Sequence, residues 1–166
     1  ARFILGNLDG FDPNTDCVAD DQLQDIDRWA LAALDDLIAN TNAGYAVYDF
    51  NKVYHAVYNF CVVAMSNFYL DVTKDRLYCT NGAGRKAAQT TMYKILVALD
   101  KIIAPILCFT SQEIWDFLPK TEGMNKYVVF EEMPKAGQYA ADDAFKAKWA
   151  QLIAVRDEVK KVLEQA

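Results

Sequence analysis

The sequence predicts an all-α fold, an antiparallel helical bundle that forms a single domain over residues 1–166. Apolar residues recur three and four positions apart along most of the chain, as one face of a helix requires. Short connections separate these segments, which is typical of antiparallel neighbours in a bundle. With 166 residues, 53% of them hydrophobic, the chain is long enough to form one hydrophobic core but short for two separate ones.

The chain opens inside a helical pattern and then enters its first long helix. Residues 1–8 are typical of the C-terminal part of a helix, because no N-cap residue precedes their apolar positions. We therefore expect that the sequence begins within a helix. After a loop around Pro13, a helix is expected over 20–46, with Asp20 or Asp21 as its cap. The apolar face of this helix comprises Leu23, Ile26, Trp29, Ala30, Ala33, Leu34, Leu37 and Ile38.

A second helix is expected from Asp49, and it is the richest in apolar and aromatic residues. Because little of it is purely polar, we predict that it is the central, most buried helix. The aromatic residues assigned to the core rather than to a stacking surface are Tyr54, Tyr58, Phe68 and Tyr69. Two glycines within 81–84 then break the pattern, and a third long helix follows until Pro105.

Shorter elements complete the predicted bundle. The hydroxyl residues Thr110 or Ser111, followed by Glu113, predict the cap of a short helix that ends before a proline. Residues 127–130 form the only strand-like stretch, so at most one short strand is expected. The last helix is expected to begin at residues 142–143, where two aspartates suit a helix N-terminus, and to run to the end of the chain.

The composition excludes several classes of protein. The four cysteines, Cys17, Cys61, Cys79 and Cys108, form no Cys-x-x-Cys pair, and His55 is the only histidine, so no metal site is predicted. Three of them lie in apolar or helical surroundings, and we interpret the cysteines as buried free thiols of a cytoplasmic protein. The longest apolar run, residues 60–65, is far below the about 20 residues that span a bilayer, so no membrane partner is expected.

Enzyme signatures are absent from the sequence. It contains no phosphate-binding loop, no dinucleotide-binding glycine motif and no nucleophile elbow. His55 lies in a helical run without a candidate nucleophile, which favours a structural role. Paired acids at 20–21, 35–36, 131–132 and 142–143 are expected to be solvated rather than catalytic or metal-binding. We therefore predict no catalytic residue in this chain.

Residues 48–63, with the sequence YDFNKVYHAVYNFCVV, carry the most informative motif. Together with SNFYLD at 66–71 and KDRLY at 74–78, they resemble the anticodon-binding domain of class I isoleucyl-tRNA synthetases. Valyl, leucyl and methionyl enzymes share this bundle, but the YNFC and KDRLYC segments are most similar to the isoleucyl branch. Further matching segments follow the family's order at 2–8, 27–31, 104–107, 110–115, 156–159 and 163–164.

The resemblance covers nearly the whole chain and implies a C-terminal fragment of a larger enzyme. The family's His-Ile-Gly-His-like and Lys-Met-Ser-Lys-Ser-like motifs, which belong to a preceding nucleotide-binding domain, are absent from this sequence. We therefore expect no cofactor in this chain, because ATP and isoleucine bind the catalytic domain. The implied partners are isoleucine-accepting tRNA and the catalytic and C-terminal domains of the parent chain. The fragment is expected to be monomeric and cytoplasmic.

The net charge of −6 is unevenly distributed, which bears on RNA binding. Residues 1–49 hold two basic against ten acidic side chains, a net charge of −8, whereas residues 50–166 carry +2. The strongly basic footprint of many nucleic-acid binders is therefore absent overall. Residues 74–86 nevertheless hold four basic side chains against one acidic side chain, which is the clearest positive segment of the chain.

By resemblance, the bundle binds the anticodon stem and loop, which requires cations for phosphates and aromatic or polar groups for unstacked bases. The candidate tRNA-binding residues are Lys74, Arg76, Tyr78, Asn81, Arg85, Lys86 and Arg28. Structural alternatives stay open for three of them. Lys74 and Arg76 can pair with the acids at 71 and 75 on a solvated helix end. Arg28 can pair with acids such as Asp25 and pack its stem over the core.

Two other functions also stay open. The same bundle is compatible with a valyl, leucyl or methionyl synthetase. A free-standing helical protein-interaction module is the alternative from another class, with the acidic N-terminal region as its contact surface. Salt-dependent RNA binding separates this last alternative from a synthetase domain, because counterion release gives a slope that a protein–protein surface does not require.

Overall fold

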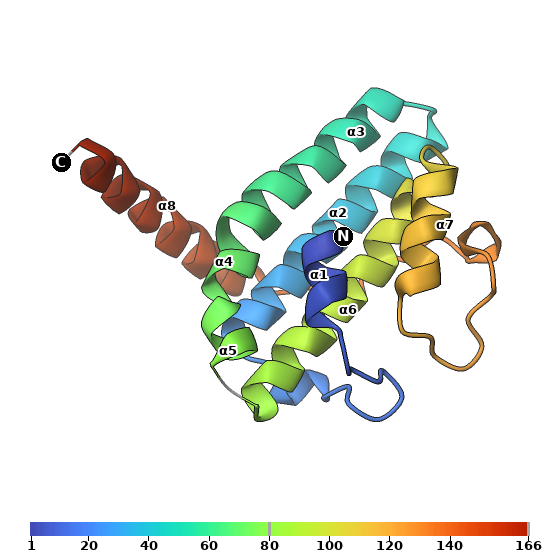
Figure 1. Ribbon diagram of the computed structural model, residues 1–166. Coiled ribbons are helices and arrows are strands. Elements are labelled where there is room, and N and C mark those ends of the chain that lie inside the picture. The colour runs from blue at the N-terminus through green and yellow to red at the C-terminus, as the bar shows by residue number, and fades with distance from the viewer. Residues whose placement is uncertain (80, 166) are drawn as a thin grey trace.

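The computed structural model describes residues 1–79 and 81–165 and is an all-α assembly, as predicted (Figure 1). Its elements are α1 (Arg2–Asn7), η1 (Asp20–Gln22), α2 (Asp25–Ala46), α3 (Phe50–Asn59), η2 (Phe60–Tyr69), α4 (Leu70–Val72), α5 (Lys74–Tyr78), α6 (Ala83–Ile103), α7 (Cys108–Phe117), η3 (Val128–Phe130) and α8 (Asp143–Gln165). The elements η1 and η3 are 3-10 turns, and η2 is a π-helix. In Figure 1, α2 and α6 run in the same direction, and α3 and α7 run back along them. Consecutive long helices are therefore antiparallel.

The central element is α6, and the prediction that the helix after Asp49 is central is wrong. Helix α6 packs against α1, α2, α5 and α7. Its fully inaccessible side chains include Ala88, Met92, Ile95, Leu96 and Ile102. These residues recur at the spacing of one helix face, and together with the inner face of α2 they form the core.

The run from α3 through η2 lies on the surface of the bundle and packs mainly against α2. Its inner side is anchored by Val53 and Tyr69, which are 1% and 0% exposed. Of the four aromatic residues predicted to be core, Phe68 and Tyr69 are buried, but Tyr54 and Tyr58 are 59% and 51% exposed. The prediction fails for these two tyrosines because, among the long helices, α3 packs mainly against α2, so one side of it faces solvent.

The junction between α2 and α3 fixes how closely the two helices approach. A Cβ on Gly44 would lie 2.9 Å from Cγ2 of Val53, so only glycine allows this contact without movement. Tyr48 then adopts a left-handed φ of 56° in the turn. Asp49 caps α3 by accepting a hydrogen bond from the Lys52 amide at 3.0 Å. The predicted start of the second helix at Asp49 is confirmed.

Two other predicted helix caps are wrong. Helix α2 begins after Gln24, whose backbone N–H donates to Oδ2 of Asp27 at 3.2 Å. Asp20 and Asp21 lie in the separate turn η1. Helix α7 begins at Cys108, so Thr110 and Ser111 lie inside it rather than before it. In both cases the true boundary lies where the chain changes direction, a few residues from the polar side chain that matched the capping pattern.

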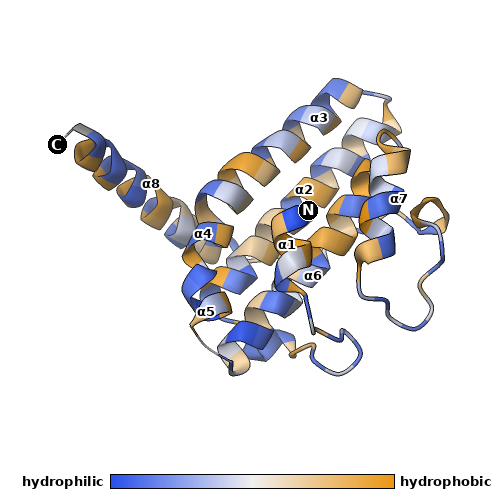
Figure 2. Ribbon diagram, in the orientation of Figure 1, coloured by the Kyte–Doolittle hydropathy of each residue, from blue (hydrophilic) through white to orange (hydrophobic). Residues whose placement is uncertain are grey.

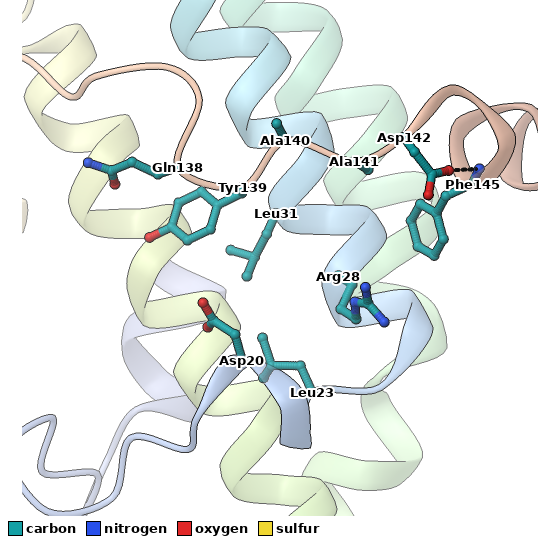
Figure 3. Close-up of a pocket in the computed structure, with 10 residues that line it drawn as sticks. All are labelled: Asp20, Leu23, Arg28, Leu31, Gln138, Tyr139, Ala140, Ala141, Asp142 and Phe145. Carbon is teal, nitrogen blue, oxygen red and sulfur yellow. Dashed lines mark hydrogen bonds between the residues drawn. The ribbon is translucent and has the colours of Figure 1, made fainter.

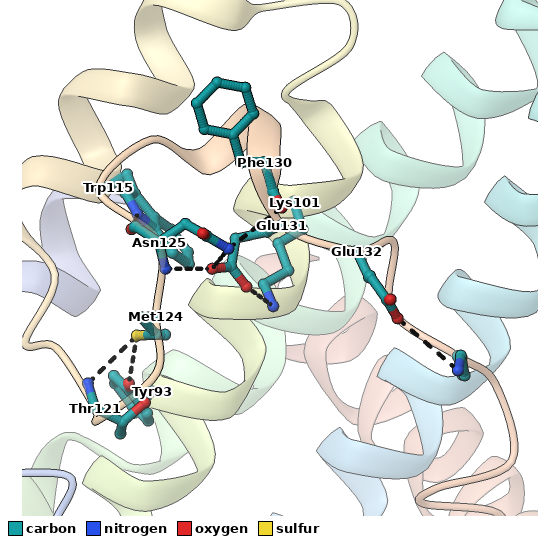
Figure 4. A network of polar contacts seen from close by, with 10 residues as sticks. Tyr93, Lys101, Trp115, Thr121, Met124, Asn125, Phe130, Glu131 and Glu132 are labelled. Carbon is teal, nitrogen blue, oxygen red and sulfur yellow. Dashed lines mark hydrogen bonds and ion pairs between the residues drawn. The ribbon is translucent and has the colours of Figure 1, made fainter.

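The segment after α7 is held against α6 by a group of polar contacts (Figure 4). Lys101 pairs with Glu131 at 2.7 Å, and the Asn125 amide donates to the same carboxylate at 2.7 Å. Burial disfavours the ionised form of Glu131, but the hydrogen bonds from Lys101 and Asn125 outweigh it and hold the pKa of Glu131 below its ordinary value. These contacts bend the chain, and the strand-like stretch at 127–130 folds as the turn η3, so no strand exists in the part of the chain described.

Helix α8 leaves the bundle after its first turns (Figure 1). The predicted start at residues 142–143 is confirmed, and Asp142 caps the helix by accepting a hydrogen bond from the Phe145 amide at 2.6 Å. The Trp149 ring lies 5.8 Å from the Trp29 ring and 6.1 Å from the Phe68 ring, which fixes this end of α8 to the bundle. Figure 2 shows hydrophobic and hydrophilic residues alternating along the projecting part. Its exposed apolar residues are Leu152, Val155, Val159, Val162 and Leu163.

The interpretation of the cysteines as buried thiols is wrong for three of the four. Cys17, Cys79 and Cys108 are exposed, and Cys61 is partly buried. Burial raises the pKa of the Cys61 thiol, which keeps it protonated and unreactive. A helical environment alone therefore did not predict burial, because these helix ends and turns lie at the surface.

Across residues 1–79 and 81–165, none of the helices combines the length and the apolar character needed to cross a membrane.

Candidate nucleic-acid interface

Arg76 forms the strongest polar contact at the corner where α5 meets the start of α2. Its guanidinium donates two hydrogen bonds to the carboxylate of Asp27, from Nη2 to Oδ1 at 2.6 Å and from Nη1 to Oδ2 at 2.8 Å. The Tyr69 hydroxyl donates a third hydrogen bond to Oδ1 at 2.7 Å. Asp27 is completely buried, and the Arg76 side chain is only 16% exposed. A bidentate pair of this kind is both strong and geometrically specific.

The pKa shifts at this corner follow from the same contact. Burial alone would lower the pKa of Arg76, but the hydrogen bonds and the charge of Asp27 raise it above its ordinary value. Burial, followed by the charge of Asp27, raises the pKa of Tyr69 well above its ordinary value. The ion pair of Arg76 with Asp27 and the neutral hydroxyl of Tyr69 therefore join α5, α2 and η2.

The structure thus corrects the assignment of Arg76 as a cation that faces phosphate. The pairing that the sequence suggested, with an acid at 71 or 75, is also wrong for Arg76, because its partner Asp27 comes from a different helix. No local pattern marks this contact, since the two residues lie 49 positions apart in the sequence.

Lys74 and Lys86 stay at the surface of the same corner. Lys74 pairs with Asp71 at 2.9 Å, as one of the two interpretations of the sequence expected, and both side chains are about half exposed. Lys86 pairs with Asp16 at 2.7 Å. The hydrogen bonds from these lysines hold the pKa values of both aspartates below their ordinary range. Exposed pairs of this kind exchange readily with other anions, so both lysines remain available to phosphate groups.

Arg85, Asn81 and Tyr78 lie between these lysines along the chain. The Arg85 guanidinium donates to Oδ1 of Asn81 at 3.1 Å. Among residues 1–79 and 81–165, no carboxylate forms a salt bridge with Arg85. Tyr78 is 64% exposed, and its hydroxyl accepts a long hydrogen bond of 3.4 Å from Asn7. The corner therefore presents a guanidinium, an amide and a phenol ring to solvent.

Arg28 faces a different neighbour, helix α8. Its guanidinium carbon lies 5.7 Å from the centre of the Phe145 ring, a cation–π contact. It lines a pocket of about 280 Å³ with Asp20 and Asp142 (Figure 3). Asp25 pairs with Lys148 instead of Arg28, so the predicted pairing with that acid is wrong. Because two acids share the pocket with Arg28, phosphate would meet more repulsion here than beside Arg85.

Comparison with known proteins supplies the decisive observation. A family model described as "Anticodon-binding domain of tRNA ligase" matches residues 27–166. The chain belongs to this family.

Relatives of this anticodon-binding domain carry the name isoleucine–tRNA ligase. Those of Syntrophotalea carbinolica, Caldicellulosiruptor saccharolyticus and Bacillus mycoides are 48%, 47% and 44% identical to it. The alignments cover 100%, 100% and 99% of this chain but only 18% of each relative. The chain thus spans less than a fifth of the length of these curated relatives.

One feature of this anticodon-binding domain escaped prediction, namely the exposed aromatic side of α3. Phe50, Tyr54 and Tyr58 are each more than half exposed. The polar residues interleaved with them at 51, 52, 55 and 59 were the available signal, because they mark a face of the helix that water can reach.

Two further features considered in the sequence are the lone histidine and the possible metal ligands. His55 is exposed on α3, and its nearest ring neighbour is Tyr54, at 5.2 Å between centres. Within the described ranges, no three His, Cys, Asp or Glu side chains are grouped so that they would hold a metal ion.

Proposed function

We propose that this chain is the anticodon-binding domain of an isoleucine–tRNA ligase and holds the anticodon stem and loop of isoleucine-accepting tRNA. The observation that carries the proposal is identity of 44–48% along essentially the whole chain to proteins of that name. In this proposal the parent enzyme attaches isoleucine to tRNA in the cytoplasm at the expense of ATP. ATP and isoleucine bind its catalytic domain, and this domain positions the tRNA.

The surface formed by α5 and the start of α6 is our candidate for contact with the RNA backbone. Arg85 is the leading cation, since it has an amide rather than a carboxylate as its partner. Lys74 and Lys86 add two half-exposed cations, each paired with an aspartate that phosphate can replace. Tyr78 and Asn81 add a ring and an amide beside them. Arg76 and Arg28 are left out of this set, because Asp27 and the α8 pocket engage them.

A fluorescence titration tests the proposal. The chain is titrated with isoleucine tRNA and with an unrelated tRNA, at low and at moderate salt. We expect tighter binding of isoleucine tRNA and an affinity that falls as salt rises, because bound phosphates release counterions. Equal binding of both tRNAs, or none, contradicts the proposal. Stronger competition by valine, leucine or methionine tRNA assigns the domain to a sister synthetase.

A further inference from the structure

The outer side of α3 carries a row of exposed aromatic rings, of which Phe50 also contacts the rings of Tyr45 and Tyr48. Phe50, Tyr54 and Tyr58 follow one another at intervals of four residues and are 51%, 59% and 51% exposed. The rings of Tyr54 and Tyr58 are stacked, with their centres 6.0 Å apart and their planes at 29°. This separation matches the about 6 Å that an α-helix rises over four residues. We call these three residues the α3 aromatic row.

The helix that carries the row is held rigidly in place. Val53, on its inner side, and Phe60, at the start of η2, are 1% and 6% exposed. Asp49 caps its first turn, and Gly44 lets α2 approach the inner side closely. The rings therefore project from a fixed backbone. Stacking of a planar ligand on them should cost the protein little conformational entropy.

The chemistry around the row favours an anionic, hydrogen-bonding partner. From residue 50 to residue 70 the chain contains no acid, although the protein carries a net charge of −6. Asn51, Lys52 and His55 are exposed beside the rings. Asp49, which precedes Phe50, is engaged as the cap of α3, and Asp36, which lines the neighbouring groove, is paired with Lys146 at 2.7 Å. This combination of rings, amides, an imidazole and a lysine suits unpaired nucleobases and their phosphates better than an apolar protein face.

We propose that the α3 aromatic row stacks on unpaired bases of the RNA loop that this domain binds. The inference rests on the proposed function and adds to it a second contact surface. Base stacking on aromatic rings tolerates any sequence, because every base has a π-face. The row thus supplies affinity for an open loop, and the cations at the start of α6 supply the salt-dependent contact with phosphates. The hydroxyls of Tyr54 and Tyr58 form no hydrogen bond within the described part of the chain, so they remain available to base edges.

The test replaces the rings without disturbing the fold. Tyr54→Leu and Tyr58→Leu remove the π-face but keep an apolar side chain, whereas Tyr54→Phe and Tyr58→Phe keep the ring. Phe117→Leu is the matched control, since Phe117 is a 72% exposed aromatic residue on α7. All variants are titrated with isoleucine tRNA over a range of salt concentrations, after circular dichroism confirms wild-type helicity.

We expect each leucine variant to bind about tenfold more weakly, the effect of losing one stacked base. The phenylalanine variants and Phe117→Leu should bind within about twofold of wild type. The slope of log affinity against log salt should not change in the leucine variants, because stacking releases no counterions.

Leucine variants that bind as wild type does overturn this inference and leave the proposed function intact. They would point to another protein segment as the occupant of the row. A weaker binding accompanied by a smaller salt slope also overturns it, because the loss would then lie in phosphate contacts. A wild-type domain that binds no tRNA overturns both proposals together.

Discussion

Replacing Arg76 by alanine is expected to destabilise the bundle by about 3 kcal/mol. Among the described residues, the substitution leaves the completely buried carboxylate of Asp27 with the Tyr69 hydroxyl and the Gln24 backbone amide as partners. Breaking a buried ion pair by removing one member costs about 3–5 kcal/mol, because the other charge stays buried without compensation. We take the lower end of that range, since the Arg76 side chain is 16% exposed and water can reach the vacated site.

Thermal unfolding followed by circular dichroism measures this loss. For a chain of 166 residues, 1 kcal/mol lowers Tm by about 2–4 °C, so Arg76→Ala should lower it by about 6–12 °C. Lys86→Ala is the control, because Lys86 is half exposed and Asp16 keeps more contact with water than the completely buried Asp27, and its Tm should stay close to the wild-type value. Adding Asp27→Asn to Arg76→Ala should recover part of the loss, because it removes the uncompensated charge. An Arg76→Ala protein with wild-type Tm would refute the structural role of the pair.

Three further predictions concern other parts of the chain. Gly44→Ala should cost about 1–3 kcal/mol in urea unfolding, because its Cβ would lie 2.9 Å from Val53, whereas Gly6→Ala, with nothing within 4 Å, should cost nothing. Burial raises the pKa of Asp100 to about 7, so the folded state keeps a proton that the unfolded chain loses, and wild-type stability falls as pH rises from about 4 to 7. Asp100→Asn should therefore be about 4 kcal/mol more stable than wild type at pH 8 and equal to it near pH 4; a pH-independent difference would contradict this. Arg85→Ala should weaken tRNA binding several-fold and reduce the salt slope by about 1, with unchanged Tm, and an unchanged slope would remove Arg85 from the interface.

Helical periodicity predicted the elements of this fold well and their burial less well. The spacing of apolar residues located α2, α6 and α8, because one buried face leaves a direct mark on the sequence. It misplaced the helix after Asp49 at the centre, since Tyr54 and Tyr58 count as apolar although they face solvent. Which helix is central depends on how many neighbours surround it, and that follows from long-range packing rather than from its own composition.

At the basic segment 74–86, the sequence located the charged residues but not the residues with which they pair. Counting charges along the sequence correctly found the basic segment at 74–86. It could not find the partners, because Arg76 pairs with a residue 49 positions away and Lys86 with one 70 positions away. Folding therefore turns one of these cations into a structural group and leaves Arg85 with a neutral partner.

The most direct test of the account transfers the anticodon stem and loop of isoleucine tRNA into an unrelated tRNA and measures the affinity of this chain for the hybrid. If the domain recognises that part of the tRNA, the hybrid should bind as tightly as isoleucine tRNA, and the reciprocal hybrid should bind as weakly as the unrelated tRNA. Affinity that stays with the body of the tRNA would contradict the account.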